Sequence, residues 1–216
     1  KTLGFTSLVG KASGAVAGFL GAATIGGLAV KAIQAYAEQE KAVARLAAAL
    51  KLAGDEAAGS VREMEAFADQ IQRQTTMNDE AVLELAALGA ALGRLTGESL
   101  RRATIAAIGF SKALNIDAQT AMRAIALAAL GNVSALTRLK ITLDDNLTPQ
   151  QKFNELLRIG AENFKIAQAE TQTMGGRLEQ MTKAVGETFE AIGRELAPAV
   201  ERMAALLTNL AREIER

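Results

Sequence analysis

The acidic residues whose spacing could support chemistry lie at three places in the chain. Residues 144–146 (Asp-Asp-Asn) form a polar run that could ligate Ca²⁺, but an EF-hand loop needs both a Gly at its sixth position and a Glu at its twelfth, and this combination is absent. The pairs Glu63/Glu65 and Glu187/Glu190 fall on the polar faces of predicted helices. We therefore predict a solvated turn and solvated helix faces at these places.

Other chemistry is limited by two missing residue types. The 216 residues contain no Cys and no His, so the chain has no thiolate nucleophile, no imidazole for acid–base work near neutral pH, and neither of the commonest zinc ligands. It also has no phosphate-binding loop, dinucleotide-binding Gly motif or nucleophile elbow. We predict that the protein is not an enzyme and that it holds no cofactor or metal.

The composition predicts an all-α protein. Half of the residues (50%) are hydrophobic but only 4% are aromatic, so the apolar mass is mainly Ala, Leu, Val and Ile, and two Pro leave few forced breaks. Lys plus Arg and Asp plus Glu each number 24, which gives no overall preference for a polyanion. A helix-turn-helix rhythm near residues 91–118 carries too few basic side chains for specific nucleic-acid binding.

Capping signals divide residues 31–170 into helices joined by short turns. A helix over residues 31–52 is predicted to stop at Gly54, and Ser60 with Glu63 resembles a capping box that opens the next. Thr148 marks the clearest predicted helix start, since Pro149 and Gln151 follow it at the first and third helical positions. Such short connections predict antiparallel hairpins. The other predicted starts are Asn78, Thr96 and Asp117, and the stops are Gly93, Asn115 and Gly131.

Each of these helices has a predicted apolar face. The side chains expected in the core are Met64, Phe67, Ile71, Val82, Leu85, Leu88, Leu92, Leu100, Ile105, Ile108, Met122, Ile125, Leu130, Phe153, Leu156, Leu157, Ile159 and Phe164.

The last forty residues or so predict one long amphipathic helix. Apolar residues recur every three or four positions, which places them in a single seam along the helix. A long helix with one apolar seam needs a partner helix, so we predict coiled-coil-like self-association. The predicted self-association residues are Leu178, Met181, Val185, Phe189, Ile192, Leu196, Val200, Met203, Leu207 and Leu210, with Ile214 continuing the pattern.

Three segments are predicted along the chain: residues 1–37, 38–174 and 175–216. Gly175 and Gly176 are the predicted hinge between a compact helical-hairpin domain and the long helix. Pro198 lacks a backbone donor and is predicted to kink that helix near Glu195.

The N-terminal segment carries a ridge of small residues. Residues 12–30 contain no charge, and this length is just enough to cross a bilayer. Gly10, Gly14, Gly18 and Gly26, with Ala22 between them, recur every four residues. Such a ridge serves close helix packing in a membrane and equally in a soluble bundle. Constitutive membrane insertion, conditional insertion and plain helix packing remain alternatives at this point.

The order of several short motifs resembles a known family. These motifs are residues 38–46 (EQEKAVARL), 66–75 (AFADQIQRQT), 79–83 (DEAVL), 113–116 (ALNI), 136–141 (LTRLKI), and the Thr173-to-Gly176 run followed by residues 195–200 (ELAPAV). Their succession over residues 30–205 is similar to the helical domain of the tail tape measure proteins of tailed bacteriophages and prophages. Lys140 departs from the pattern, because the family's Leu-Gly-Ile turn has Gly there.

The resemblance implies a structural and assembly role. It implies a virion protein in the lumen of the tail tube that sets tube length, and copies that associate through long helices, with a trimer as the family's expectation. It further implies tail-tube, tail-tip and assembly-chaperone proteins as partners. The family also assists DNA passage through the host envelope, for which residues 10–30 are this chain's candidate and the host membrane the candidate surface.

Two other functions compete with this interpretation. One is a membrane-active, channel-forming helical protein with residues 12–30 as the inserting element, although a hydrophobic helical hairpin is missing. The other is a general helical adaptor. The chain begins at Lys1 rather than Met, which predicts a piece of a longer protein.

Overall fold

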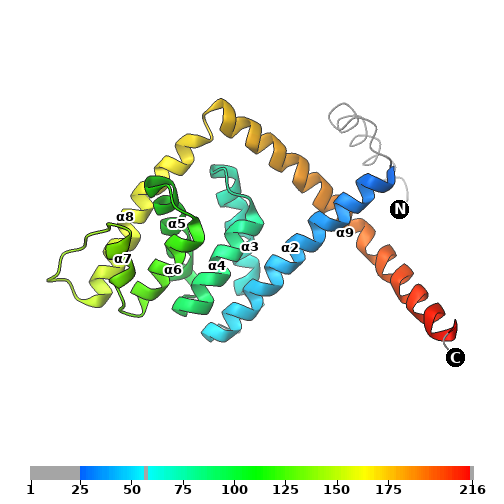
Figure 1. Cartoon of the computed structure of the whole chain (residues 1–216), viewed down its shortest axis with the longest axis horizontal. Coiled ribbons are helices and arrows are strands. Elements are labelled where there is room, and N and C mark those ends of the chain that lie inside the picture. The colour runs from blue at the N-terminus through cyan, green and yellow to red at the C-terminus, as the bar shows by residue number, and fades with distance from the viewer. Residues whose placement is uncertain (1–24, 56–57, 215–216) are drawn as a thin grey trace. The chain divides into compact units, whose positions relative to one another are not determined.

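The computed structural model describes residues 25–55 and 58–214 (Figure 1). Within those residues it contains eight α-helices and no strand, so the predicted all-α class is confirmed. The helices are α2 (Ile25–Ala53), α3 (Ala58–Gln74), α4 (Asp79–Gly93), α5 (Gly97–Leu114), α6 (Ala118–Ala129), α7 (Ser134–Arg138), α8 (Pro149–Glu170) and α9 (Met174–Ile214).

The chain divides into two compact units, and the boundaries fall inside helices. One unit comprises residues 40–181, and the other combines residues 25–39 with residues 182–214 of the described part. Helices α2 and α9 therefore each contribute to both units. The sequence-based division placed residues 1–37 and 175–216 in separate segments, and the structure groups the described residues 25–37 and 182–214 in one unit.

The unit of residues 40–181 has one continuous apolar core. Leu46 and Leu50 of α2, Leu83 of α4, Ile108 of α5 and Leu156 of α8 are each at most 2% exposed in it. Alanines fill much of the remaining space, which permits helices to approach closely. The sequence-based core is largely confirmed, including Met64, Phe67, Ile71, Val82, Leu85, Leu100, Met122, Ile125, Phe153, Leu157 and Phe164, with Leu88, Ile105 and Ile159 partly buried.

Helices α5 and α8 meet through two glycines. A Cβ atom added to Gly160 would lie 2.5 Å from the Cα atom of Ala106, and one added to Gly109 would lie 2.7 Å from the backbone nitrogen of Phe164. Residues 106 and 109 thus face residues 160 and 164 in the same order, so the two helices run parallel. This close approach was not predicted, because an isolated Gly in a helix gives no sign of its neighbour.

Helices α4 and α6 also meet at small residues. A Cβ atom on Gly93 would lie 3.0 Å from the Cα atom of Ala126, and one on Gly89 would lie 2.9 Å from the sulfur of Met122. Gly93 was predicted as a helix stop, yet it is the last residue of α4 and is buried against α6. Arg94 follows as the C-cap residue, with a φ of 51°.

Most predicted helix ends agree with the observed helix bounds, and several are also supported by capping hydrogen bonds. Thr148 and Gln151 form a reciprocal capping box, and Asp117 accepts from the backbone N–H of Thr120. After α2, the N–H of Gly54 donates to the carbonyl of Lys51 and that of Asp55 donates to Leu50, which is a Schellman motif.

Three sequence-based predictions in this unit are wrong. Ser60 does not open a helix, because α3 begins at Ala58 and the Ser60 hydroxyl donates to the Asp55 carboxylate at 2.8 Å. Leu92 and Leu130 were expected in the core but are 43% and 58% exposed. Both lie in the last turn or the cap of a helix, where the chain turns away from the core.

Lys140 takes the backbone conformation that glycine favours. It has a φ of 57°, in the left-handed region. The Lys140 N–H donates to Thr137 and the Ile141 N–H donates to Leu136, so α7 ends in a Schellman motif with Lys140 at its left-handed position. The turn geometry therefore matches a Gly position although the side chain is Lys.

Within the other unit, α2 and α9 cross each other (Figure 1). At the crossing, a Cβ atom on Gly193 would lie 2.6 Å from the carbonyl carbon of Ala32 and 2.9 Å from the Cβ atom of Tyr36. Gly193 thus permits backbone contact between the two helices.

Candidate functional site

The predicted self-association seam lies on α9, a helix of 41 residues. Two stretches of the seam are exposed: Leu178 is 59% exposed and Met181 50%, while Val200 is 40% exposed and Met203 62%. Exposed apolar residues in a row along one helix indicate a surface that another helix can cover.

The middle of the seam is more enclosed. Val185, Phe189, Ile192 and Leu196 are half-buried, and they lie on the stretch of α9 that holds the crossing residue Gly193. Over residues 178–206 the seam therefore consists of a partly covered stretch with an exposed stretch on either side of it.

Sequence reasoning missed one seam residue. Leu206, 68% exposed, was not predicted, yet it follows Met203 by three positions and belongs to the same apolar face. Leu207 and Leu210, which were predicted, are positions of α9 whose side chains lie outside the described part.

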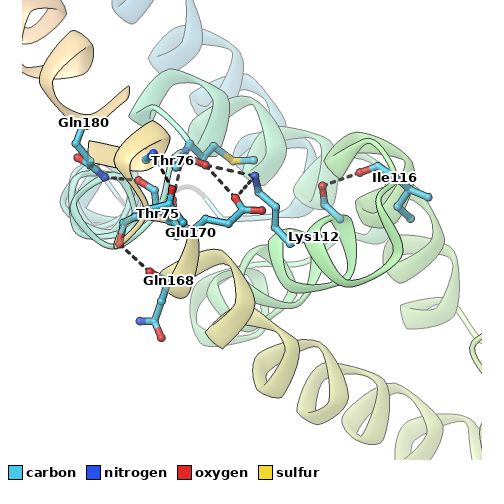
Figure 2. Close-up of polar contacts among 12 residues, drawn as sticks. Thr75, Thr76, Lys112, Ile116, Gln168, Glu170 and Gln180 are labelled. Atoms are coloured by element: carbon cyan, nitrogen blue, oxygen red, sulfur yellow. Dashed lines mark hydrogen bonds and ion pairs between the residues drawn. The ribbon is translucent and has the colours of Figure 1, made fainter. Parts of the chain in front are cut away.

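The corner between α8 and α9 is tied to the core of its unit by polar contacts (Figure 2). Glu170, the last residue of α8, pairs with Lys112 of α5 at 2.5 Å. The hydroxyl of Thr76 lies 3.4 Å from the same carboxylate and 3.3 Å from the Lys112 ammonium. The side-chain amide nitrogen of Gln168 donates a hydrogen bond to the side-chain oxygen of Gln74 at 2.9 Å.

Gln180 continues these ties on the first turns of α9. Its amide nitrogen donates to the backbone carbonyl of Gln72 at 3.0 Å and also to that of Thr75 (Figure 2). These carbonyls lie at the C-terminal end of α3, where helix carbonyls lack partners within the helix. Gln180 therefore caps α3 and holds the first turns of α9 in place.

The predicted hinge glycines lie inside α9 rather than before it. The helix begins at Met174, and the break from α8 covers residues 171–173. Thr173 caps the new helix by accepting from the N–H of Gly176 at 3.0 Å. A Cβ atom on Gly176 would lie 2.7 Å from the Cα atom of Thr171, so this residue is required for the tight corner, whereas Gly175 has open space.

Pro198 lies in the interior of α9, which continues on both sides of it to Ile214. The predicted kink near Glu195 stays a prediction.

Three of the acidic residues considered above make hydrogen bonds or ion pairs. Asp144 accepts from the backbone and the side chain of Asn146, which makes an exposed turn. Glu63 pairs with Arg101 at 2.6 Å. Glu190 pairs with Arg194 at 2.5 Å and its side chain is only 13% exposed, so the prediction of a fully solvated face is wrong there. No group of acidic side chains in the described part could hold a metal ion.

Arg158 on α8 is the centre of an exposed ionic cluster. It bonds Glu155 at 2.7 Å and Glu162 at 2.5 Å. The hydrogen bond from Arg158 lowers the pKa of Glu155, and the two carboxylates raise the pKa of Arg158.

The predicted membrane ridge falls mostly outside the described residues. Gly10, Gly14 and Gly18 lie there, and Gly26 is in the first turn of α2. Among the helices of the described part, none combines the length and the apolar character needed to cross a bilayer.

Comparison with models of protein families, with curated proteins and with solved structures finds no match to this chain.

Proposed function

We propose that this chain is a structural and assembly protein of a phage tail, the helical domain of a tape measure that occupies the lumen of the tail tube. The motif order over residues 30–205 supports the proposal from the sequence. The single structural observation that supports it best is the apolar seam of α9, a 41-residue helix, which is exposed at residues 178–181 and again at residues 200–206.

The seam would join copies of the chain. After Pro198 the seam continues with Val200, Met203 and Leu207, at intervals of three and four residues, which is the spacing of a helix face that packs on another helix. Val200, Met203 and the neighbouring Leu206 are exposed. Burying these side chains between copies removes apolar surface from water, at roughly 25 cal/mol per Å². A coiled-coil association of α9, with three copies as the family's expectation, is part of this proposal.

Length would be measured by helix geometry. An α-helix rises about 1.5 Å per residue, so α9 alone spans about 60 Å. A tube that polymerises until its internal protein is covered acquires a length set by the residue count. Tail-tube, tail-tip and chaperone proteins are the proposed partners, and the virion tail is the proposed location.

Sedimentation equilibrium tests the self-association. We expect the chain to be oligomeric and the double variant Met203→Glu with Leu206→Glu to shift it toward monomer. The matched control is Ala205→Glu with Arg202→Gln, which makes the same change of −2 in net charge on exposed positions that lie further from the seam. Equal oligomerisation of all three proteins would remove the seam from the proposal.

Electron microscopy of assembled tails tests the measuring role. Deleting the codons for residues 200–213 from the phage gene should shorten the tail by about 21 Å, because 14 helical residues rise about 1.5 Å each. Tails of unchanged length would contradict a ruler function for this helix. If they are unchanged, and the variant Met203→Glu with Leu206→Glu forms no tails while its control does, the helix acts in assembly and not in length measurement.

A further inference from the structure

A groove between α5 and α8 has a basic rim and an apolar floor. It has a volume of about 340 Å³ and is lined by Arg102, Ile105, Leu157, Arg158, Ala161, Glu162 and Lys165. Both walls are helices of the unit formed by residues 40–181, and the parallel contact at Gly109 and Gly160 holds them together. The groove is thus built on rigid elements.

Two of the cationic side chains have no acidic partner in the described part of the chain. Arg102 projects from α5 and Lys165 from α8, both exposed, and neither takes part in an ion pair there. Arg158 differs, because Glu155 and Glu162 already neutralise it. With Glu155 counted beside Glu162, the groove carries three cations and two carboxylates, which leaves it with a net charge of +1.

The floor between these cations is apolar. Leu157 is 2% exposed, Ile105 is half-buried, and the Cβ of Ala161 adds a small apolar surface. Residues 102 and 105 of α5, and residues 158, 161 and 165 of α8, recur at helical spacing along the two walls. A trough between two helices accepts a third helix, whose side chains fit between theirs.

We propose that this groove binds an amphipathic helix of another protein that carries carboxylates on both sides of an apolar residue. Its carboxylates pair with Arg102 and Lys165, and its apolar side chain covers Ile105 and Ala161. A nucleic acid fits less well, because no aromatic side chain lines the groove for base stacking. The groove lies on elements other than α9, so this proposal does not depend on the tape measure assignment.

The test uses the whole chain and a synthetic helical peptide of about 20 residues, long enough to be helical in isolation. The peptide has Glu at positions i and i+7 and Leu at positions i+3 and i+4, so that all four side chains lie on one face, as in helix-in-groove ligands. We expect amide NMR shifts of groove residues on titration, and binding that weakens as salt increases.

Charge reversal distinguishes binding in the groove from nonspecific electrostatic attraction between the peptide and the protein. Arg102→Glu with Lys165→Glu should weaken binding about tenfold or more, whereas Arg123→Glu with Arg138→Glu should not, although it makes the same change in net charge at exposed sites on α6 and α7. Equal weakening by both variants, or equal binding of a peptide with Lys in place of Glu, would overturn the proposal. Tighter binding of a single-stranded oligonucleotide than of the acidic peptide would also overturn it.

Discussion

The backbone of Gly109 in α5 packs directly on that of Gly160 in α8. A Cβ atom on Gly109 would overlap the carbonyl oxygen of Gly160, and a Cβ atom on Gly160 would lie 2.5 Å from the Cα atom of Ala106. Because these atoms belong to backbones, no side chain can rotate away to make room. The pair therefore sets how closely α5 and α8 approach, and with it the geometry of the groove between them.

Gly109→Ala or Gly160→Ala should destabilise the protein by about 1–3 kcal/mol, because overpacking at the contact outweighs the gain of about 1 kcal/mol in helix propensity. Urea unfolding followed by circular dichroism measures this. Gly186→Ala is the control, since its Cβ meets open space, and it should be neutral or stabilising. A stabilised Gly109→Ala protein would show that the helices can move apart at little cost.

Lys140→Gly should stabilise the protein by about 1 kcal/mol, because Lys140 is held at a φ of 57° and an L-residue is strained in that region. Lys140→Ala is the matched control; it removes the same charge without relieving the backbone, so it should leave stability close to that of the parent. The midpoint of thermal unfolding reports both. If the two variants behave alike, the Lys140 backbone is not strained.

Gln180→Glu should be more destabilising than Gln180→Ala. The Ala variant loses the donor to the carbonyls of Gln72 and Thr75, at a cost of about 1 kcal/mol. The Glu variant additionally brings a carboxylate to the negative end of α3. Faster amide hydrogen exchange in the last turn of α3 and the first turns of α9 is the expected signature. Unchanged exchange in both regions would mean that Gln180 does not hold the corner.

Glu155 should titrate below its usual range, because Arg158 bonds its ionised form. Its folded-state pKa is depressed, so the stabilisation is present above the unfolded pKa and is lost as pH falls through the folded pKa. The pair is exposed, so the effect on stability is small. Side-chain carboxyl NMR of Arg158→Gln should show the Glu155 pKa moving upward, whereas Arg138→Gln should leave it unchanged.

Local signals predicted local structure well. Thr148 and Asp117 start helices and Gly54 ends one, because their hydrogen bonds involve only neighbours within a few residues. The exceptions are instructive: Ser60 has the right sequence for a cap, but its hydroxyl bonds Asp55 inside a helix that has already begun. Leu130 has the right period for the core, yet it falls in the C-cap of α6.

The sequence by itself determined the all-α class, most helix ends, most core positions and the single apolar face of α9, because periodicity and capping act over one or two helical turns. Only the tertiary structure decided which glycines bring backbones together, that Gln180 caps α3, that the seam is more enclosed over residues 185–196 than in the exposed stretches on either side, and that Arg102 and Lys165 flank one groove. Each of these features depends on residues far apart in the chain that come together in the fold. Neither periodicity nor capping signals in the sequence indicate such long-range contacts.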